Sequence, residues 1–531
     1  MKLLRRGAIA FSLANLCYLQ SWLSILAYSK SDSFLMKSAP NPAQYLALMT
    51  AVLLQALLLF LLATLAARIN GHLATLGRLV FLLILVIPLE HIRAQLLQVT
   101  TVFGHEFLRT TAPSAIVNLP VVLAVILLLW NRARWESRLV QAASSALVAC
   151  APLALLTFGG AVYKIATANP KPFENHPTAS WLAVQKDHPR VILALFDEWD
   201  YRLTFEDRKA GVSLPNLDRL RQSALFATNA HSPKPATIFS VPALLTGEDV
   251  ADVRPVGVSR LDVRLEGQKS WASLAQFPTL FTRAREAGVN AAAFGWYLPY
   301  CRLFSKDLVS CDWNGMELQY NSKGVSFGAG LVNEPRSLLE FKLHSGEEVA
   351  FWSIFGQALA TEHRVRTYAA EQTSVLEEAA NNQLGLLYVH YPLPHSPYFY
   401  DTNNGTFDLN TTKSTGYLQN LALVDKSVGE LRRRLEESGL WNTTTVLLMT
   451  DHSSRASVHL DGKTDPRIPF ILKMAGSDEG IQVDFPFNSL LTGDLVLAIL
   501  AKRVSTPQDA ARWIAAHAEK QPPTLRARTF K

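Results

Sequence analysis

The chain has 531 residues, and 49% of them are hydrophobic, a high share for a soluble enzyme of this length. Its formal net charge is +7, but Lys and Arg form no clustered stripe along the chain, which argues against nucleic acid as a partner. The hydrophobic residues concentrate before about residue 165, so the composition predicts two parts of different kind.

The N-terminal part contains five apolar stretches, each long enough to cross a bilayer, which takes about 20 mostly apolar residues. They cover 7–28, 44–67, 77–97, 113–131 and 140–163. With the N-terminus inside, Lys and Arg are more frequent in the inner segments than in the outer loops, as expected for cytoplasmic segments. We therefore predict an integral protein of a bacterial inner membrane, with five transmembrane helices over 1–165, a linker over 166–188 and a periplasmic domain over 189–531.

The part after residue 189 alternates strands and helices. Buried strands are predicted at 191–196, 289–296, 384–390 and 444–452, and helices at 215–225, 276–288 and 417–440. This alternation predicts an α/β domain with a mostly parallel sheet sandwiched by helices. In such sheets, binding sites form beyond the carboxyl ends of the strands.

Polar side chains stand at three of these strand ends. They are Asp197 and Glu198, His390, and Asp451 with His452. Carboxylates beside an imidazole suit a divalent cation. Adjacent acids repel each other unless a cation is near, and either a metal or Arg202 would supply one. Alone, the acids also fit solvated loop charges, and the Asp-His pair also fits a helix cap with a chance histidine.

A hydroxyl residue, Thr237, opens the stretch TIFSVPALLTG, directly after a loop broken by Pro233 and Pro235. Two interpretations are open: a helix cap, or a nucleophile whose hydroxyl pKa is lowered by a nearby metal. His395 lies between prolines in HYPLPHSPY, and a rigid loop aims a side chain at low cost in entropy. We expect His395 to be a ligand or a phosphate-binding donor, with a plain surface histidine as the alternative.

The four cysteines divide between the two parts. Cys17 and Cys150 fall inside predicted spans, where they fit plain apolar packing. Cys301 and Cys311 lie in the outer domain, where an oxidising compartment allows them to pair.

Five segments after residue 189 resemble the alkaline phosphatase superfamily in its sulfatase-like branch. They are RVILALFDEWD, LPNLDRLRQSALFATNAHS, TIFSVPALLTG, the helix and strand that end in TTVLLMTDH, and DGKTDPRIPFIL, in the family's order. Thr237 occupies the place where sulfatases carry the Cys or Ser that becomes formylglycine, and the Arg of that motif is missing. Threonine there is similar instead to the phosphoethanolamine transferases that modify lipid A and to lipoteichoic acid synthases. Both of these families also place five spans before an extracytoplasmic catalytic domain.

The resemblance implies a role for each matching position. Thr237 would be the catalytic nucleophile. The metal site would comprise Asp197, Glu198, Thr237, Asp451 and His452, with either Asp197 or Glu198 as the main acidic ligand of the first strand. His395 would contact substrate, while His459 and Lys463 compete for a further substrate-binding role. The metal implied is Zn²⁺, with Mn²⁺ or Mg²⁺ as alternatives.

Taken together, the residues and the resemblance predict a membrane-anchored phosphotransferase. It would move a phospho-headgroup, of phosphoethanolamine or glycerophosphate type, from a phospholipid to lipid A, a glycan or another envelope acceptor through phospho-Thr237. One alternative is a phosphoester hydrolase that uses the same site with water as the acceptor. The other is a non-catalytic envelope protein that retains the fold, for which Thr237→Ala would have no effect.

Overall fold

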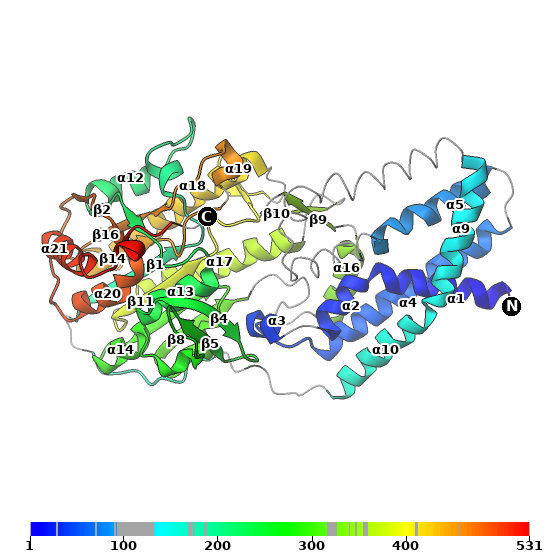
Figure 1. Cartoon of the computed structure of the whole chain (residues 1–531), viewed down its shortest axis with the longest axis horizontal. Helices are drawn as coiled ribbons and strands as arrows, with labels where there is room; N and C mark the ends of the chain where they lie inside the picture. Colours follow the sequence, from blue (N-terminus) through cyan, green and yellow to red (C-terminus); the bar gives the residue numbers. More distant parts are fainter. Residues whose placement is uncertain are drawn as a thin grey trace.

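The molecule has two parts along its longest axis, a bundle of N-terminal helices and an α/β domain (Figure 1). The computed structural model describes residues 2–27, 30–68, 72–89, 92, 132–167, 173, 176–184, 188–315, 326–338, 340–345, 348–353, 359–408, 413–455 and 457–529.

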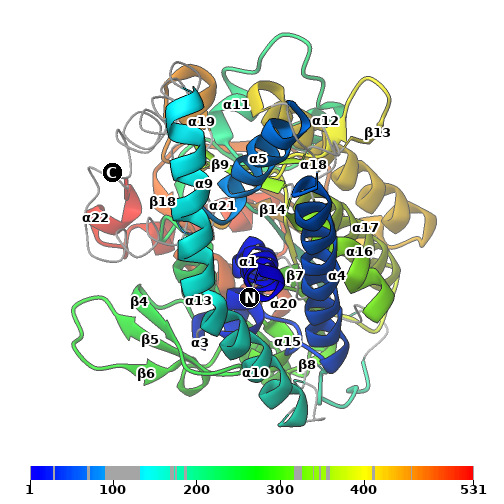
Figure 2. The ribbon, with the colours of Figure 1, turned by 90° about the vertical axis from the view of Figure 1, so that its right-hand side faces the viewer.

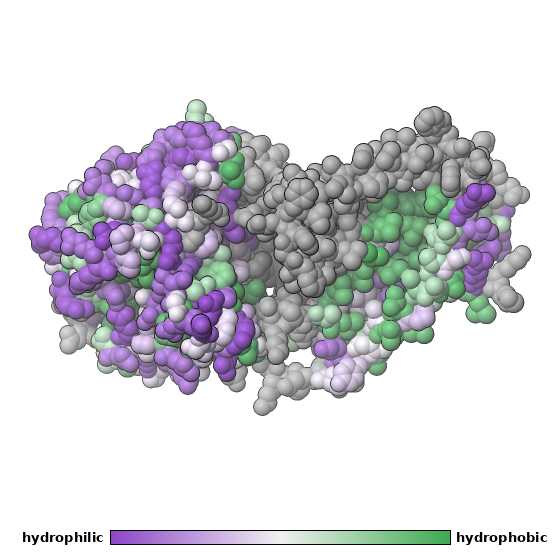
Figure 3. All heavy atoms as spheres, in the orientation of Figure 1, coloured by the Kyte–Doolittle hydropathy of each residue, from purple (hydrophilic) through white to green (hydrophobic). Residues whose placement is uncertain are grey.

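Apolar helices form the N-terminal part. Their bounds are α1 Lys2–Cys17, α2 Leu19–Leu26, α4 Pro42–Ala66, α5 His72–Ile84, α9 Arg132–Ala149 and α10 Ala151–Ala166. Seen end-on, α1 runs between α4 on one side and α9 with α10 on the other (Figure 2). Leu54, Leu57 and Leu61 of α4 are about half exposed, and hydrophobic residues dominate this part of the surface, whereas the α/β domain is mostly hydrophilic (Figure 3). An exposed apolar surface of this extent fits contact with lipid.

Two to three helices among the described residues are compatible with a membrane anchor. Pro42–Ala66 and Ser137–Ala166 are each long and apolar enough to cross a membrane, and α1 with α2, bent by 62° at Tyr18, would make a third span. The predicted segment 77–97 is described only in part, and 113–131 lies outside the described residues. The number of five spans therefore stays a prediction.

An eight-stranded sheet forms the centre of the α/β domain. In spatial order its strands are β17 Ile481–Val483, β2 Leu225–Ala227, β16 Phe470–Lys473, β14 Thr444–Met449, β1 Arg190–Phe196, β11 Leu386–Tyr391, β7 Ala291–Trp296 and β8 Leu308–Asn314. Only β16 runs antiparallel to its neighbours in this sheet, as described, so the prediction of a mostly parallel sheet is confirmed. Leu195 of β1 pairs with Met449 on one side and His390 on the other, which brings three strand ends level.

Helices cover both faces of the sheet. One face is covered by α13 Thr237–Thr246, α14 Leu280–Glu286, α20 Thr492–Leu500 and α21 Pro507–Ala518, and the other by α12 Pro215–Gln222, α17 Leu359–Ala379 and α18 Lys413–Glu437. Along β1, Leu193 and Leu195 pack into the first layer, while Ile192 and Ala194 pack into the second. The predicted sandwich of helices around the sheet is confirmed.

Small sheets surround this core. They join β15 Arg467–Ile468 with β3 Ala230–His231 and β18 Phe487–Asn488, β4 Val250–Pro255 with β5 Leu261–Leu265 and β6 Ala272–Ser273, β9 Glu340–Ser345 with β10 Glu348–Ser353, and β12 Tyr400–Asp401 with β13 Thr406–Phe407.

All three predicted helices have different bounds in the structure, and the one expected at 417–440 covers Lys413–Glu437. The helix expected at 215–225 ends at Gln222, because Leu225–Ala227 form β2 beside β16. The helix expected at 276–288 begins only at Leu280, after Pro278. The Thr279 side chain accepts a hydrogen bond from the Thr282 backbone N–H at 3.2 Å and caps that helix.

The segment between α2 and α4 anchors the helical bundle to the α/β domain. Phe34, in α3 (Lys30–Leu35), is fully buried in the hydrophobic layer around α13 and α14. Arg302, in α15 (Tyr300–Leu303), donates hydrogen bonds to the carbonyl oxygens of Phe34 at 2.7 Å and Met36 at 2.8 Å. Its guanidinium lies 4.8 Å from the centre of the Trp313 ring. Burial lowers the pKa of Arg302 to about 10, so it remains charged at neutral pH.

A disulfide and an ion pair complete this contact, which we call the junction. Cys301 and Cys311 are bonded, so the pairing that the sequence allows is present, and each lies next to a residue of the junction. Lys37 Nζ lies 2.6 Å from Asp312 Oδ1. The disulfide therefore braces the two chain segments that hold the loop between α2 and α4.

One buried acid lies where the α/β domain meets α4. Glu334 belongs to α16 (Phe327–Ser337), which packs against α4, and its side chain is almost fully buried. Burial raises the pKa of Glu334 to about 8.

Candidate metal centre and active site

The carboxyl ends of three adjacent strands meet at one edge of the sheet. Asp197 follows β1, Asp451 and His452 follow β14, and His390 lies near the end of β11. Thr237 is the first residue of α13, which begins beside this edge. The structure thus brings the predicted strand-end residues together, as the parallel order of β14, β1 and β11 requires.

Asp197, Asp451 and His452 form a group that is able to hold a metal ion. Their ligand atoms all lie within 4.8 Å of one another. The His452 Nε2 atom is 3.5 Å from both Asp197 Oδ1 and Asp451 Oδ2, and all three side chains are fully buried. Asp197 Oδ1 and Asp451 Oδ2 accept no hydrogen bond of normal length within the described residues.

This arrangement fits a divalent cation. Burial and the nearby carboxylate of Asp451 raise the pKa of Asp197 well above its usual range. Two buried carboxylates with unpaired oxygens repel each other, and a cation between them removes the repulsion. Two carboxylate oxygens and one imidazole nitrogen are donors that Zn²⁺ or Mn²⁺ accepts.

The orientation of His452 presents a lone pair to this group. Its Nδ1 lies 3.0 Å from the carbonyl oxygen of Ser453, which only an N–H at Nδ1 satisfies. Nε2 is then an acceptor, and it faces Thr237 Oγ1 at 3.4 Å. The backbone thus fixes the tautomer that metal binding or hydrogen bonding to Thr237 needs.

Thr237 is not the cap of its helix. Ala236 holds the N-cap position, so Thr237 is one residue inside α13, and its side chain is 6% exposed. Ser240, one turn later, donates a hydrogen bond to the carbonyl oxygen of Asp451 at 2.5 Å and ties α13 to the end of β14. The open N–H groups at the start of a helix also favour an anionic group at this place.

Glu198 lies beside the metal group but has another partner. The Arg455 guanidinium contacts Glu198 Oε1 at 2.6 and 2.8 Å, and His395 Nε2 lies 4.0 Å from the same oxygen. Burial alone would raise the pKa of Glu198, but His395 and Arg455 hold it below its usual range. The structure therefore groups Asp197, not Glu198, with the other ligands, and a ligand role for Glu198 stays a prediction.

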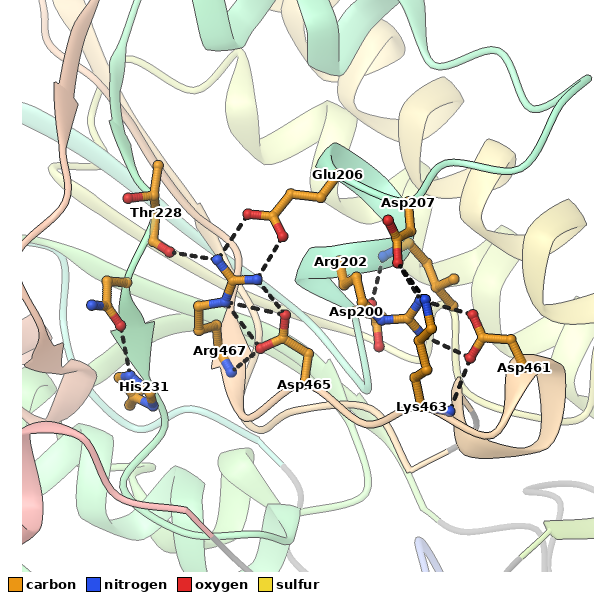
Figure 4. A network of polar contacts seen from close by, with 12 residues as sticks. Asp200, Arg202, Glu206, Asp207, Thr228, His231, Asp461, Lys463, Asp465 and Arg467 are labelled. Carbon is orange, nitrogen blue, oxygen red and sulfur yellow. Dashed lines mark hydrogen bonds and ion pairs between the residues drawn. The ribbon is translucent and has the colours of Figure 1, made fainter.

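Asp200, the last residue of FDEWD, and Arg202, which follows in α11 (Tyr201–Phe205), have structural partners. Asp200 caps α11 by accepting a hydrogen bond from the Leu203 backbone N–H at 2.7 Å. Arg202 does not pair with Asp197 or Glu198. It binds Asp461 with two hydrogen bonds, of 2.7 and 2.9 Å, so a cation for the strand-end acids has to come from elsewhere (Figure 4).

The two residues that compete for the last substrate-binding role lie after β14. His459 is in α19 (Ser457–Asp461), but its side chain lies outside the described part of the structure. Lys463 is largely exposed, and its Nζ lies 3.4 Å from Asp207 Oδ2 (Figure 4). No described contact joins Lys463 to the metal group, and both roles stay predictions.

His395 lies at the mouth of the site. Its Nδ1 is 2.6 Å from the carbonyl oxygen of Ser396 and therefore carries a proton, and its Nε2 faces Glu198 Oε1 at 4.0 Å, where the carboxylate attracts a second proton. Its ring meets the edge of Trp296 at 5.3 Å between centres. His395 thus lies next to Glu198, which follows Asp197 in the chain, and its substrate-binding role stays a prediction.

Sequence reasoning missed Arg455 and Tyr297 as site residues, and it named His390 as a strand-end residue without giving it a role. Arg455 was visible as the last letter of TDHSSR, but nothing in the sequence ties it to Glu198. Tyr297 follows β7 with φ +73°, a left-handed backbone that is unusual for a bulky residue. Burial, together with the negative charge of Asp197, raises the pKa of Tyr297 to about 12, so its hydroxyl stays protonated beside the carboxylates.

Comparisons with known proteins identify the family of the chain. A family profile described as Sulfatase matches residues 207–490, more than half of the chain. No match was found among curated proteins.

Solved structures are similar only at low identity. Ps i-CgsB in complex with k-i-k-neocarrahexaose is 16% identical over 63% of this chain and 77% of its own, with a TM-score of 0.43. An alkaline phosphatase superfamily protein from Vibrio parahaemolyticus is 15% identical over 61% and 68%, with a TM-score of 0.39. The phosphonate monoester hydrolase of Silicibacter pomeroyi is 16% identical over 59% and 73%, with a TM-score of 0.40. Because all three TM-scores are below 0.5, the family assignment rests on the sequence match.

Proposed function

Because the chain belongs to the sulfatase family of enzymes, we propose that it is a membrane-anchored, metal-dependent phosphotransferase. It takes a phospho-headgroup from a phospholipid and passes it to a hydroxyl or amine of a cell-envelope acceptor, such as lipid A or a glycan. One observation carries the proposal: Thr237, a residue that cannot become formylglycine, is buried at the start of α13 with its Oγ1 3.4 Å from His452 Nε2 of the metal group.

Thr237 acts as the nucleophile in this proposal. In the first half-reaction the bond between Thr237 Oγ1 and phosphorus forms, the bond from phosphorus to the diacylglycerol oxygen breaks, and the threonine proton ends on the released diacylglycerol. His395 Nε2, at the mouth of the site, is the group placed to carry that proton. In the second half-reaction the acceptor oxygen or nitrogen bonds to phosphorus, the bond to Thr237 breaks, and the acceptor's proton returns to threonine.

Asp197, Asp451 and His452 would hold the metal, with Thr237 next to them. When bound, the metal supplies positive charge that lowers the pKa of a hydroxyl and stabilises negative charge on a phosphoryl group. Arg455 provides a second, half-exposed positive charge on the solvent side of Glu198. This charge substitutes for the arginine that the sulfatase nucleophile motif has and TIFSVPALLTG lacks.

A lipid donor is favoured by the membrane anchor and the junction. Two to three apolar helices and the buried contact around Phe34 keep the α/β domain attached close to the helical bundle. Donor and site then share one surface, which raises their effective concentration. The Cys301–Cys311 disulfide fits an oxidising compartment, so we place the domain in the periplasm of a bacterial inner membrane.

The test is mass analysis of the peptide that contains Thr237, using full-length protein in nanodiscs of phosphatidylethanolamine or of phosphatidylglycerol with Zn²⁺ or Mn²⁺. We expect a headgroup-phosphate adduct on wild type and on Thr237→Ser, which keeps a hydroxyl, and none on Thr237→Ala. Product that forms only when lipid A or a glycan is added supports transfer. Free headgroup phosphate formed without an acceptor assigns the same site to hydrolysis, and no adduct in any lipid rejects the covalent mechanism.

A further inference from the structure

A chain of three buried side chains stands directly behind Asp451. Tyr300 Oη lies 2.8 Å from His390 Nδ1 and 3.3 Å from Tyr388 Oη. On its other side, His390 Nε2 faces Asp451 Oδ2 at 3.8 Å. His390, Tyr300 and Tyr388 are all fully buried, so this chain has no contact with solvent.

At the end of this row of side chains, His390 Nε2 depends on Asp451 for an interaction partner. His390 Nε2 has no hydrogen-bond partner of normal length among the described residues. The Trp296 backbone carbonyl is a further acceptor near the ring, and Asp451 Oδ2 is the charged atom that Nε2 faces. A buried imidazole nitrogen without a partner costs free energy. Its retention at this place therefore needs an explanation other than packing.

The proton positions follow from the two neighbours of the ring. If Nδ1 carried the proton of a neutral ring, the Nε2 lone pair would point at a carboxylate oxygen, and the two would repel. If instead Tyr300 donates to Nδ1, and Tyr388 donates to Tyr300, then Nε2 carries the proton and points it at Asp451. Only the second arrangement is attractive along the whole chain.

The neighbouring strand is shaped to admit this contact. Gly295 of β7 is the register partner of His390. A Cβ at Gly295 would lie 2.9 Å from Tyr300 Cε2 and 3.0 Å from the His390 Cβ, closer than such atoms approach. Any larger residue would thus push Tyr300 and His390 apart, so the absence of a side chain at 295 is a second sign that their contact matters.

We propose that His390 is a positioning residue that directs its Nε2–H at Asp451 Oδ2 and so, together with the His452 backbone N–H that binds Oδ1 at 2.9 Å, holds the carboxylate in the orientation that faces Asp197 and His452. We give His390 no catalytic role, because its side chain is fully buried and faces Asp451 and Tyr300. It is also outside the group whose ligand atoms lie within 4.8 Å of one another. The inference rests on the metal site of the proposed function, but not on the donor, the acceptor or the covalent step.

Metal affinity tests the role without any turnover. Full-length protein in detergent is stripped with a chelator and titrated with Zn²⁺ alone against a chromophoric competitor. Because partners that orient metal ligands contribute 10- to 100-fold to affinity, we expect His390→Phe to weaken Zn²⁺ binding by roughly that factor. Tyr300→Phe should weaken it less, because His390 keeps its place and loses only the bond that selects its tautomer.

Two further variants separate positioning from packing. His390→Gln can place an N–H near the position of Nε2 and should restore much of the affinity. Tyr391→Phe is the matched control: Tyr391 is the next residue on β11, is equally buried, and loses a comparable 2.8 Å hydrogen bond, to Gln372, on the opposite face of the sheet. It should lower the thermal transition of the metal-free protein as the others do, but leave the affinity unchanged.

The outcomes are distinct. Wild-type affinity in His390→Phe, or equal losses in His390→Phe and Tyr391→Phe, overturns the positioning role. A loss confined to His390→Phe and Tyr300→Phe supports it, even if wild type forms no adduct on Thr237, in which case the phosphotransferase proposal fails and the positioning role stands.

Discussion

Replacing Arg302 by methionine should release the loop between α2 and α4 from the α/β domain while leaving the metal site in place. The substitution keeps an unbranched apolar side chain over Trp313 but removes both hydrogen bonds to the carbonyl oxygens of Phe34 and Met36. Hydrogen bonds from a charged donor contribute about 1.5–3 kcal/mol each, and the contact with the aromatic ring about 1 kcal/mol. Because methionine keeps most of the packing on the ring, we expect local opening to become easier by roughly 3–6 kcal/mol, which is about 100- to 10,000-fold.

Hydrogen exchange measured by mass spectrometry reports this opening directly. Amides in peptides covering residues 33–38 should exchange faster by that factor in Arg302→Met, and less so in Arg302→Lys, which keeps the charge but not the paired donors. Peptides from β14 should be unchanged, because this strand lies in the centre of the sheet. Exchange at 33–38 that stays within about threefold of wild type would show that Phe34 alone holds the junction, and would refute the energy assigned here to Arg302.

Three further predictions concern other parts of the molecule. Replacing both Cys301 and Cys311 by Ser opens a loop with a sequence separation of 10 and should lower stability by about 3 kcal/mol. Hydrogen exchange at 33–38 should become faster, while Zn²⁺ affinity should stay unchanged. A loss of affinity would show that the disulfide supports the metal site. The pKa of Glu334, about 8 instead of 4.5, means that its stabilising protonated form is complete below pH 4.5 and lost as pH rises through about 8. Wild type should therefore lose up to about 1.4 kcal/mol of stability per pH unit in this range relative to Glu334→Gln, and thermal transitions of the two that stay parallel would contradict this. Arg455→Gln should raise KM for a phosphoester about tenfold with a smaller change in kcat, because a half-exposed cation binds the ground state and the transition state equally well. A loss in kcat of about tenfold would instead show that Arg455 stabilises the transition state specifically.

The sequence predicts those features of the fold that repeat locally. The buried strand before Asp197 and the one before Asp451 are visible as short apolar runs, and their parallel order follows from the helices between them. Because carboxyl ends of parallel strands lie at one edge, this is enough to expect Asp197, Asp451 and His452 together. Helix bounds depend on tertiary pairing instead, which is why the helix from Pro215 ends early to make room for β2.

Contacts between distant segments could not be predicted in the same way. Arg455 is separated from Glu198 by 257 positions, and Lys37 from Asp312 by 275, and a single sequence carries no signal that pairs them. The position of Thr237 shows a subtler limit. Its pattern allowed a cap, but the cap is one residue earlier, because Ala236 has the extended backbone, with φ −150° and ψ 146°, from which the helix starts.

The left-handed backbone at Tyr297 and Glu198 lowers the stability of the fold at positions that the site uses. Among the described residues, positive φ at a residue other than glycine occurs only at Tyr297 (+73°), Glu198 (+61°) and Lys502 (+58°). A side chain in this conformation costs about 1 kcal/mol or more relative to glycine, which adopts it freely. Selection for thermal stability alone would therefore favour glycine at both strand ends. A variant with glycine there would be more stable, but it would lack the hydroxyl of Tyr297 and the carboxylate that binds Arg455. A thermostable relative that still carries both side chains would mark them as under functional selection.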